Sequence, residues 1–388
     1  MTADALTLGM VAGETSGDLL AGAVLGGLTA RGTPLRAAGI GGPTMQAHGF
    51  EAWWSIEALS VNGYAEVLRE YPRLRRMRNE LRRRLIEWRP RLFVGVDAPD
   101  FNLDLEASLR AQGIRVAHFI GPSVWAWRRE RLAKIRDSVD HMLLVFPFEE
   151  AIYREAGIPA TYVGHPLADA IPLQPDTVAA RAALGLSPQA PVVALLPGSR
   201  PSEVRQLLQP FLRTALWLSQ RRRDVQFVLP AASAALFERI RAEAAALAAR
   251  EAAGGALPLT VVSGRSHDAL AAADAVLVAS GTATLETALF RRPMVIAYRV
   301  SALSYQLMKR MAYLPYVGLP NILCGRFVVP EFLQAEVRPD AMGEALLRQL
   351  EDRRHRESIV EQFGSLHESL RRGCAARAAQ ALLELADA

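Results

Sequence analysis

The chain has 388 residues, a length that suits two domains of ordinary size better than one core. Hydrophobic residues make up 51% of it and charged residues 22%, which excludes an intrinsically disordered chain. The formal net charge is +5 and the basic side is almost all arginine, with Lys134 and Lys309 as the lysines, so charge alone allows anionic lipid, phosphorylated substrates or nucleic acid as partners.

No segment reaches the roughly 18 uncharged apolar residues that a membrane-spanning helix needs. The best candidate, residues 19–30, is too short, and Glu14 and Asp18 precede it where a signal peptide has a basic start. We therefore expect a cytoplasmic protein. Two cysteines, Cys324 and Cys374, form no disulfide framework and have no zinc spacing, so we expect neither a metal nor a cofactor.

Short apolar runs alternate with longer amphipathic stretches from the first residues onward. The runs of the first half are residues 6–12, 35–40, 92–96, 116–120 and 141–146, and those of the second half are 192–196, 225–229, 259–262, 275–279 and 294–297. Alternation of strand and helix predicts crossover connections and parallel sheets. Strands that are apolar throughout indicate sheets covered by helices on both faces.

The alternation is interrupted once, at residues 164–191, which hold five prolines and no good strand. This composition predicts an interdomain linker, with a short helix at 177–184. After about residue 338 only helical patterns remain. We therefore predict three parts: a Rossmann-like domain over 1–170, a second one over 171–345, and C-terminal helices over 346–388 that pack back across the domains.

The first strand ends in the sequence AGETSGD, which begins at Ala12 and opens a helix. Small residues there let a ligand approach the backbone, and the acids suit sugar hydroxyls better than a diphosphate. We predict that the acids of this loop, Glu14 and Asp18, hydrogen-bond to sugar hydroxyls. The alternative is a helix-capping turn that uses Ser16 or Asp18.

The strand at 92–96 ends in the sequence DAPDFN, which begins at Asp97. Asp100 or Asn102 can cap the next helix, which leaves Asp97 without an obvious structural role. A carboxylate at the end of a strand can accept a proton from a nucleophilic hydroxyl, so Asp97 is the candidate catalytic base. Capping or a structural hydrogen bond is the alternative.

A third loop of the first half holds Trp125, Trp127 and Arg128 in the sequence GPSVWAWR. Paired aromatic rings beside a cation are typical of a carbohydrate or acyl site, but core packing explains them equally well. His165, in the sequence GHP, is either a phosphate or sugar contact or a satisfied hinge histidine.

The second half has two loops of the phosphate-binding type. One follows the strand at 192–196 and holds Gly198, Ser199 and Arg200, whose guanidinium can clamp a phosphate pair. The other follows the strand at 275–279 and opens a helix. Its candidate residues are Ser280, Gly281, Thr282 and, one turn into the helix, Glu286. Together the loops predict a nucleoside diphosphate site that uses arginine and backbone N–H groups in place of Mg²⁺.

Residues 61–89 carry a strongly basic pattern, with nine arginines and three glutamates between Arg69 and Arg89. Pro72 predicts a helix that begins at about Arg73. Basic and aliphatic residues together predict contact with an anionic membrane surface. The residues expected to make it are Val67, Leu68, Leu74, Arg75, Arg76 and Met77. The alternative is a crossover helix whose apolar stripe is core; nucleic acid is disfavoured because no binding module surrounds the run.

Eight motifs occur in one order along essentially the whole chain: AGETSGD, GIGGPTMQAHGF, DAPDFN, GPSVWAWR, GHPLADA, LLPGSR, ASGTATLE and LPN. In this series the chain resembles the lipid-A-disaccharide synthases. The resemblance implies two Rossmann-like parallel-sheet domains facing a cleft, the glycosyltransferase B-type fold, with C-terminal helices. It also implies an inverting, metal-independent transfer from UDP-2,3-diacylglucosamine to 2,3-diacylglucosamine 1-phosphate, which yields lipid A disaccharide 1-phosphate and UDP.

The resemblance carries over to single residues as well. Asp97 matches the proposed base and Arg200 a UDP-phosphate contact, Glu286 and Asn321 match active-site positions, and Glu14 and Ser16 match the acceptor loop. It further implies a homodimer that is peripheral on the cytoplasmic face of the inner membrane. Two rivals remain at this point: another UDP-sugar enzyme of the same fold, such as a UDP-N-acetylglucosamine 2-epimerase, and a nucleotide-binding module without catalysis.

Overall fold

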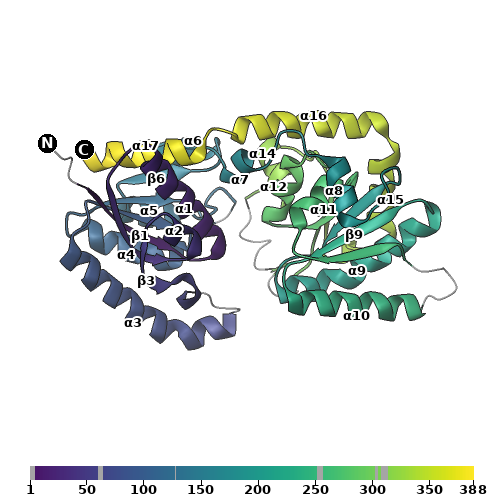
Figure 1. Cartoon of the computed structure of the whole chain (residues 1–388), viewed down its shortest axis with the longest axis horizontal. Helices are drawn as coiled ribbons and strands as arrows, with labels where there is room; N and C mark the ends of the chain where they lie inside the picture. The colour runs from purple at the N-terminus through teal and green to yellow at the C-terminus, as the bar shows by residue number, and fades with distance from the viewer. Residues whose placement is uncertain (1–4, 60–63, 127, 251–256, 302–304, 307–312) are drawn as a thin grey trace. The chain divides into compact units, whose positions relative to one another are not determined.

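The computed structural model describes residues 5–59, 64–126, 128–250, 257–301, 305–306 and 313–388, with only the backbone of 15 and 64–69 (Figure 1). By its internal contacts the chain divides into two compact units. Unit 1 comprises Met1–Asp169 and Leu370–Ala388, and unit 2 comprises Ala170–Ser369. The last stretch of the chain therefore returns to the unit in which the chain begins.

Unit 1 is built on a seven-stranded sheet of order β3-β2-β1-β4-β5-β6-β7, in which every pairing is parallel. Its strands are β1 (Leu6–Ala12), β2 (Leu35–Gly41), β3 (Glu51–Ser55), β4 (Leu92–Val96), β5 (Arg115–Phe119), β6 (His141–Leu144) and β7 (Ala160–Tyr162). The strand order reverses between β1 and β4, and Ala12 lies opposite Val96 there. We call such a place the switch point of a sheet.

Helices cover both faces of this sheet. They are α1 (Thr15–Ala30), α2 (Pro43–Ala47), α3 (Tyr64–Trp88), α4 (Pro99–Arg110), α5 (Arg131–Ser138), α6 (Glu149–Glu155) and α17 (Cys374–Asp387), with a 3-10 turn η1 (Ile56–Ala58). α1 packs against α2 and α17, whereas α4 packs against α3 and α5. The core beneath α3 and α4 joins Leu81 and Leu85 to Phe93 and Val116. α7 (Pro166–Ala170) follows, where the chain passes from unit 1 into unit 2.

Unit 2 repeats the plan with a six-stranded parallel sheet of order β10-β9-β8-β11-β12-β13. Its strands are β8 (Val192–Leu196), β9 (Gln226–Ala231), β10 (Leu259–Ser263), β11 (Ala275–Ala279), β12 (Met294–Tyr298) and β13 (Glu331–Leu333). Its helices include α8 (Thr177–Leu184), α9 (Pro201–Arg221), α10 (Ala234–Arg250), α11 (Ser266–Ala272), α12 (Thr282–Leu289), α14 (Leu319–Cys324), α15 (Pro339–Glu351) and α16 (Arg353–Leu370), with a 3-10 turn η3 (Gln334–Glu336). The switch point lies between β8 and β11, where Leu196 faces Val278.

The predicted α/β class with two parallel sheets is confirmed, and all ten predicted strands are present within a few residues of the expected bounds. The helix at 177–184 is also present as α8. Three strands were not predicted: β3, β7 and β13. Each lies at the edge of its sheet, and β7 and β13 are three residues long, so neither shows a continuous apolar run.

The basic helix α3 differs from its prediction in two respects. It begins at Tyr64 and holds Pro72 in its interior, on an exposed position, instead of beginning after it. Met77 is 7% exposed and belongs to the core cluster of unit 1, and Leu74 packs against that cluster. The expected membrane contact of Met77 is therefore wrong, because its side chain covers the sheet. The side chains of Val67 and Leu68 fall outside the described residues.

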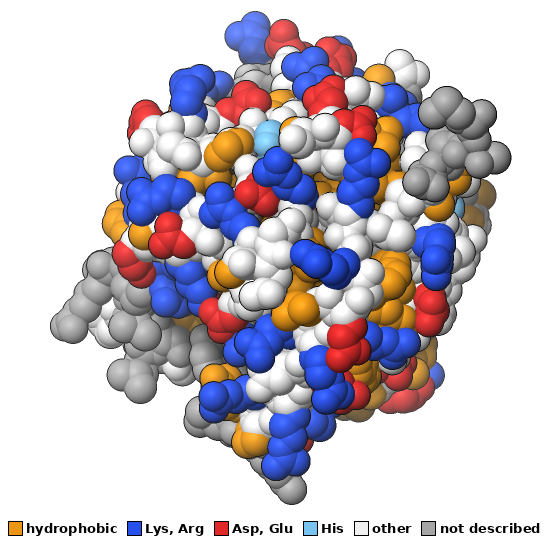
Figure 2. Space-filling model, turned by 90° about the vertical axis from the view of Figure 1, so that its left-hand side faces the viewer, with side chains coloured by type: hydrophobic (Ala, Val, Ile, Leu, Met, Phe, Trp, Pro, Cys, Tyr) orange, Lys and Arg blue, Asp and Glu red, His pale blue; other side chains and the backbone are white. Residues whose placement is uncertain are grey.

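The outward face of α3 carries its charge. Arg75, Arg76, Arg82 and Arg83 are exposed, and Tyr71 is 54% exposed beside them. Figure 2 shows the left-hand side of the view in Figure 1. Lys and Arg side chains are spread over this side, and several of them lie at the height of α3. Neighbouring arginines are paired with acids: Arg73 with Glu70 at 2.5 Å, and Arg84 with Glu51 at 3.8 Å. The Arg84 guanidinium also lies 4.0 Å from the ring centroid of Trp53.

Candidate active site

All the loops singled out in the sequence lie at the carboxyl ends of strands. In unit 1 the loops after β1 and β4 flank the switch point, and in unit 2 those after β8 and β11 do. Ligands of open parallel sheets bind at this place, because the helices on either side of it diverge. Each unit thus has one candidate site, and each is described separately below.

Asp97 leaves β4 with an unusual backbone conformation. Its φ is +53° and that of Ala98 is +44°, so two consecutive residues with a Cβ occupy the left-handed region. Two hydrogen bonds hold the turn: Asp97 N–H donates to the Phe119 carbonyl at 2.9 Å, and Asn102 Nδ2 donates to the Asp97 carbonyl at 2.8 Å. Such strain costs about 1–3 kcal/mol per residue and concentrates at functional sites. The Asp97 side chain is half-buried, and its carboxylate makes no hydrogen bond to the residues described.

The predicted cap of the following helix is absent. The residue that precedes α4 is Ala98, and no side chain caps the helix there. Asn102 is fully buried, and its amide holds the Asp97 carbonyl instead. Asp100 is exposed and pairs with Arg131. Asp97 thus remains the acid of the motif without a hydrogen bond from its carboxylate among the described residues, and its role as a base stays a prediction.

The loop after β1 lies directly against the Asp97 turn. A Cβ on Gly13 would stand 2.4 Å from the Cβ of Ala98, so glycine is needed for the two loops to touch. Glu14 and Ser16 are exposed at this loop, and Glu14 precedes α1 without capping it. The loop that leads into Glu14 and Ser16 therefore touches the Asp97 turn at Gly13.

Asp18 has a structural role that the sequence did not reveal. It is 2% exposed, and its carboxylate accepts the backbone N–H groups of Gly42, Thr44 and Met45 at 2.8, 2.9 and 3.1 Å. It therefore caps α2 and not its own helix, and three of its roughly four acceptor positions are used there.

Trp125 belongs to an aromatic cluster behind the loop after β5. Its ring meets Phe148 edge-on at 5.5 Å, Phe148 stacks on Phe146 at 5.7 Å, and Phe146 stacks on His165 at 5.5 Å. Trp125 is still partly exposed, so packing and ligand contact are both open to it. Trp127 lies outside the described residues, and Arg128 Nε lies 3.3 Å from Glu130 Oε1.

Two titratable groups are buried in this cluster. Burial raises the pKa of Glu149 to about 7, although hydrogen bonds from Phe146 and Val145 N–H and from Trp125 oppose the shift. Burial lowers the pKa of His165 to about 4, and its Nδ1 accepts the Leu167 N–H at 3.2 Å. His165 is thus a neutral histidine that hydrogen-bonds within the chain. This agrees with its interpretation as a structural hinge histidine.

In unit 2 the loop after β8 is organised by Glu203. Gly198 has a φ of +124°, and a Cβ there would stand 2.5 Å from the Cβ of Glu203. Glu203 Oε2 accepts the N–H groups of Ser199 and Arg200 at 3.1 and 3.3 Å, and its Oε1 accepts from Arg200 Nη1 at 3.0 Å. The backbone donors expected to bind phosphate are therefore occupied, and the Arg200 side chain, 70% exposed, is the group available to an anion.

The loop after β11 keeps its donors available. Gly281 has a φ of +142° and nothing within 4 Å of its missing Cβ, so the turn is open on that side. Thr282 and Ala283 begin α12, and the first N–H groups of a helix have no partner inside it. Ser280 Oγ donates to the Val317 carbonyl at 2.7 Å, which ties the loop to a neighbouring segment. This helix start is therefore the candidate anion-binding element of unit 2.

Glu286 lies one turn into α12 with its side chain 21% exposed. His267 of α11 approaches it, with Nε2 at 3.5 Å from Glu286 Oε2. The hydrogen bond to Glu286 raises the pKa of His267 despite partial burial. A carboxylate in this place can accept from sugar or ribose hydroxyls.

Asn321 is fully engaged inside the protein. Its Nδ2 donates to the Val329 carbonyl at 2.9 Å and to Glu331 Oε1 at 2.8 Å, and its Oδ1 accepts the N–H groups of Val328 and Val329 at 2.7 and 3.1 Å. Glu331 in turn accepts from Val317 and Gly318 N–H. Asn321 thus holds the segment that Ser280 contacts, and its amide has no hydrogen-bonding group to spare for a donor.

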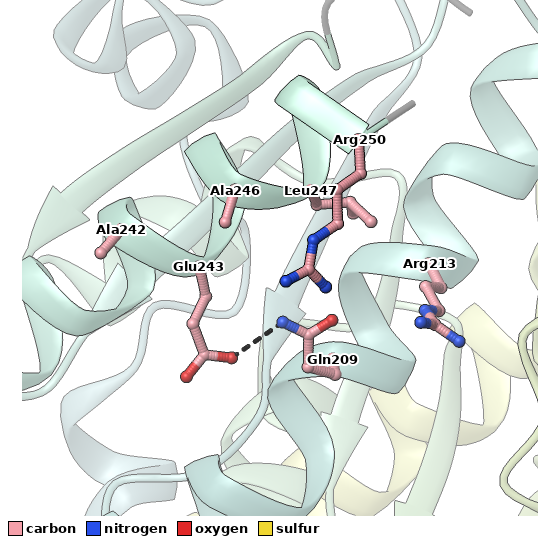
Figure 3. Close-up of a pocket in the computed structure, with 7 residues that line it drawn as sticks. All are labelled: Gln209, Arg213, Ala242, Glu243, Ala246, Leu247 and Arg250. Atoms are coloured by element: carbon pink, nitrogen blue, oxygen red, sulfur yellow. Dashed lines mark hydrogen bonds between the residues drawn. The ribbon is translucent and has the colours of Figure 1, made fainter. Parts of the chain in front are cut away.

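A shallow pocket also occurs between α9 and α10, lined by Gln209, Arg213, Ala242, Glu243, Ala246, Leu247 and Arg250 (Figure 3). Gln209 Nε2 donates to Glu243 Oε2 across it at 3.1 Å, and Arg239 pairs with the other oxygen at 2.9 Å. The pocket lies in the helix layer away from the strand ends, so we do not place a nucleotide there.

Within the described ranges, no helix is both long and apolar enough to cross a membrane. The same residues contain no group of three or more His, Cys, Asp and Glu side chains that could hold a metal ion.

The sequence reasoning missed a buried polar group behind Asp97, formed by Asn102, Glu106 and His118, each with 0% exposure. A signal for part of it was present. Asn102 and Glu106 are four residues apart, so they share the helix face that buries Leu103 and Leu109. Polar residues on an apolar face indicate a buried network.

Two Rossmann-like parallel-sheet units in one chain are the architecture of the glycosyltransferase B-type (GT-B) fold. Solved structures share the fold: UDP-N-acetylglucosamine 2-epimerase from Neisseria meningitidis, with a TM-score of 0.61 at 11% identity over 98% of both chains, and sucrose-phosphate synthase from Thermosynechococcus elongatus, with 0.60 at 16% over 98% of both. The fold alone therefore does not separate transferases from epimerases.

The sequence comparisons do separate them. The profile of the lipid-A-disaccharide synthetase family matches residues 8–385. The chain is 54% identical over 373 residues to the lipid-A-disaccharide synthase of Thiobacillus denitrificans, covering 96% of this chain and 98% of the relative. It is 51% identical to that of Burkholderia vietnamiensis, covering 98% and 96%. The chain belongs to the lipid-A-disaccharide synthase family.

Proposed function

We propose that the protein transfers 2,3-diacylglucosamine from its UDP derivative to the 6-hydroxyl of 2,3-diacylglucosamine 1-phosphate. The products are a β-1,6-linked disaccharide 1-phosphate and UDP. Family membership supports the reaction, and the two candidate sites supply groups suited to its two halves. The observation that carries the proposal is the Asp97 carboxylate, which is held on a strained turn at the switch point without a hydrogen-bond partner among the described residues.

In the proposed mechanism Asp97 accepts the proton of the acceptor 6-hydroxyl while the oxygen of that hydroxyl attacks the anomeric carbon of the donor sugar. The bond from that carbon to the diphosphate oxygen breaks, and UDP leaves with the electron pair, so the anomeric configuration inverts. Arg200 and the N–H groups of Thr282 and Ala283 stabilise the charge that develops on the diphosphate. Glu286 accepts from donor hydroxyls, and Glu14 and Ser16 bind the acceptor.

The reaction is tested by incubating the protein with each lipid alone and with both. UDP release that requires UDP-diacylglucosamine and diacylglucosamine 1-phosphate together supports the transfer. The epimerase alternative makes a different prediction, namely an epimerised sugar formed from UDP-N-acetylglucosamine with no free UDP. That result, with no disaccharide from the lipid pair, would overturn the proposal.

We further propose that the protein is peripheral on the cytoplasmic face of the inner membrane and docks through the outward face of α3. Both substrates carry acyl chains and reside in a bilayer. Arg75, Arg76, Arg82 and Arg83 are exposed along this face, and anionic lipid attracts each basic residue by about 1 kcal/mol. Tyr71 adds an amphipathic ring suited to the headgroup layer.

Vesicle sedimentation tests this docking face. Changing all four arginines to Gln lowers affinity for vesicles containing phosphatidylglycerol by about two to three orders of magnitude. The matched control is Arg353→Gln with Arg354→Gln on α16, two arginines that are equally exposed. Unchanged binding of the α3 variant would place the docking surface elsewhere. The homodimer implied by the family resemblance is tested separately, by light scattering.

A further inference from the structure

Three polar side chains are completely buried behind the Asp97 turn. Asn102 and Glu106 come from α4 and His118 from β5, and none has any exposed surface. His118 Nδ1 lies 2.7 Å from Glu106 Oε1, and Asn102 Nδ2 donates to the Asp97 carbonyl at 2.8 Å. The group thus reaches the candidate base through its backbone.

Strand β4 leaves space for this group because it carries a glycine next to it. Gly95 precedes Asp97 by two residues and lies opposite His118 in the sheet. A Cβ on Gly95 would stand 2.0 Å from Glu106 Oε1 and 3.1 Å from the Cβ of Asn102. Any larger residue would expel the carboxylate, so the backbone of β4 and the polar group are fitted to one another.

The group is costly for the fold. Asn102 Oδ1, Glu106 Oε2 and His118 Nε2 are buried without a hydrogen-bond partner among the described residues. Buried polar atoms are nearly always paired, because losing water without a replacement is unfavourable. Leucine or valine would fill the same space between β5 and α4 without this cost. Three such atoms around one site indicate that the group serves the chemistry and not stability.

The electrostatics of the group point toward Asp97. Burial of the ring disfavours protonation of His118, but the charge and hydrogen bond of Glu106 outweigh it and raise the pKa of His118, with a smaller contribution from Asp97. Glu106 on α4 and Asp97 on the turn are the charged groups that face this ring among the described residues. The charge of Asp97 therefore reaches the His118 ring as well as that of Glu106, which couples the buried group to the turn.

We propose that Asn102, Glu106 and His118 are positioning residues for the catalytic base. Asn102 holds the left-handed turn that presents Asp97, and the Glu106–His118 pair supports that turn from behind and interacts electrostatically with the Asp97 carboxylate. This inference rests on the proposed role of Asp97. It goes beyond that role by assigning a function to the buried group on the strand and helix behind it.

The coupling is measured directly by an NMR titration of the protein labelled with ¹⁵N in its histidine rings. Asp97→Asn lowers the titration midpoint of His118, because the ring loses the charge of the Asp97 carboxylate. An identical midpoint in the two proteins overturns the inference. Activity of the same Asp97→Asn protein tests the proposed function separately, because retained turnover removes Asp97 as the base whatever the titration shows.

The functional consequence is measured with His118→Gln. Its kcat falls about tenfold or more, the acid limb of its kcat/KM profile moves to higher pH, and its KM for the UDP-sugar stays unchanged. The matched control is His141→Gln on the adjacent strand β6, where His141 Nε2 bonds Thr161 Oγ1 at 2.8 Å, and it leaves the profile in place. A uniform loss of activity with an unmoved acid limb indicates a structural role and overturns the inference. If His118→Gln does not fold, the titration decides alone.

Discussion

The two units have the same kind of sheet, but the residues at their switch points differ in type and in backbone conformation. In unit 1 residues with side chains are forced into the left-handed region, at Asp97 and Ala98. In unit 2 that region is left to glycine, at Gly198 and Gly281. Unit 1 hides a titratable group behind its turn, whereas unit 2 presents an exposed arginine and a helix start.

This difference corresponds to two tasks. Binding a diphosphate needs donors that the anion can reach, and glycine turns and helix starts provide them at little cost in strain. Holding a base needs one carboxylate in a defined direction and protonation state, which requires a rigid turn and charged neighbours. The comparison therefore predicts that changes in unit 1 affect the chemical step, while changes in unit 2 affect donor binding.

The largest effect is expected at the base. Asp97→Asn keeps the shape of the turn but cannot accept a proton, so kcat falls about a thousandfold. Asp100→Asn is the matched control, since Asp100 belongs to the same motif but pairs with Arg131 at the surface. It costs less than about threefold, as an exposed ion pair contributes little. Steady-state UDP release measures both, and equal losses would show that the motif acts as a whole and not through Asp97.

Arg200→Ala is expected to have the next largest effect. Removing the guanidinium lowers kcat/KM for the UDP-sugar about a hundredfold, because the departing diphosphate loses its main cation. Arg213→Ala, an exposed position farther along α9, changes it by less than about twofold. Isothermal titration with UDP separates binding from chemistry. Unchanged UDP affinity together with a lowered kcat would assign Arg200 to the transition state alone.

These loops were accessible to sequence reasoning because glycine, hydroxyl and charged residues at strand ends form local patterns. The strands were accessible for the same reason, as each buried run stands out from its polar flanks. What failed depended on partners distant in sequence. The sequence suggests that Asp18 caps its own helix α1, but its partners are N–H groups of residues 42–45, at the start of α2. Met77 reads as exposed on a basic helix, but the sheet of unit 1 covers it.

The buried group behind Asp97 shows the same limit. His118 lies in the run 116–120, which the sequence predicts to be an ordinary apolar strand, and Glu106 lies in a helix with several other charges. Only the packing of α4 on β5 brings their atoms to 2.7 Å. Asn321 is a related case. Its motif predicts an active-site residue, but its side-chain amide makes four hydrogen bonds, to backbone groups and to Glu331, and is not free.

Glycine replacements test the comparison with a smaller effect. Gly13→Ala places a Cβ 2.4 Å from Ala98, so the Asp97 turn must move and kcat falls by roughly tenfold. Gly281→Ala meets no atom, but its φ of +142° strains alanine by about 1–3 kcal/mol and weakens UDP binding. Kinetics and UDP titration on both variants show the division. The reverse pattern, with weakened UDP binding from Gly13→Ala, would contradict it.

The smallest effect concerns the pH dependence of stability in the aromatic cluster of unit 1. The pKa of Glu149 rises from 4.5 to about 7, so between these values the folded state binds the extra proton and stability falls as pH rises. The pKa of His165 falls from 6.5 to about 4, so the unfolded state binds the extra proton there and stability rises with pH. The two slopes oppose one another between pH 4.5 and 6.5.

A variant that removes one of the two groups should therefore show the pH dependence of stability that the other group causes. Glu149→Gln leaves His165 uncompensated, and the free energy of unfolding then rises with pH by up to about 1 kcal/mol per unit across this window. His165→Gln leaves Glu149 uncompensated, and stability falls with pH up to about 7. Denaturant unfolding at pH 5, 6 and 7 measures both. Glu149 and His165 both belong to unit 1, so UDP binding at the switch point of unit 2 should stay constant across the same variants. A change in it would show that the cluster influences donor binding as well.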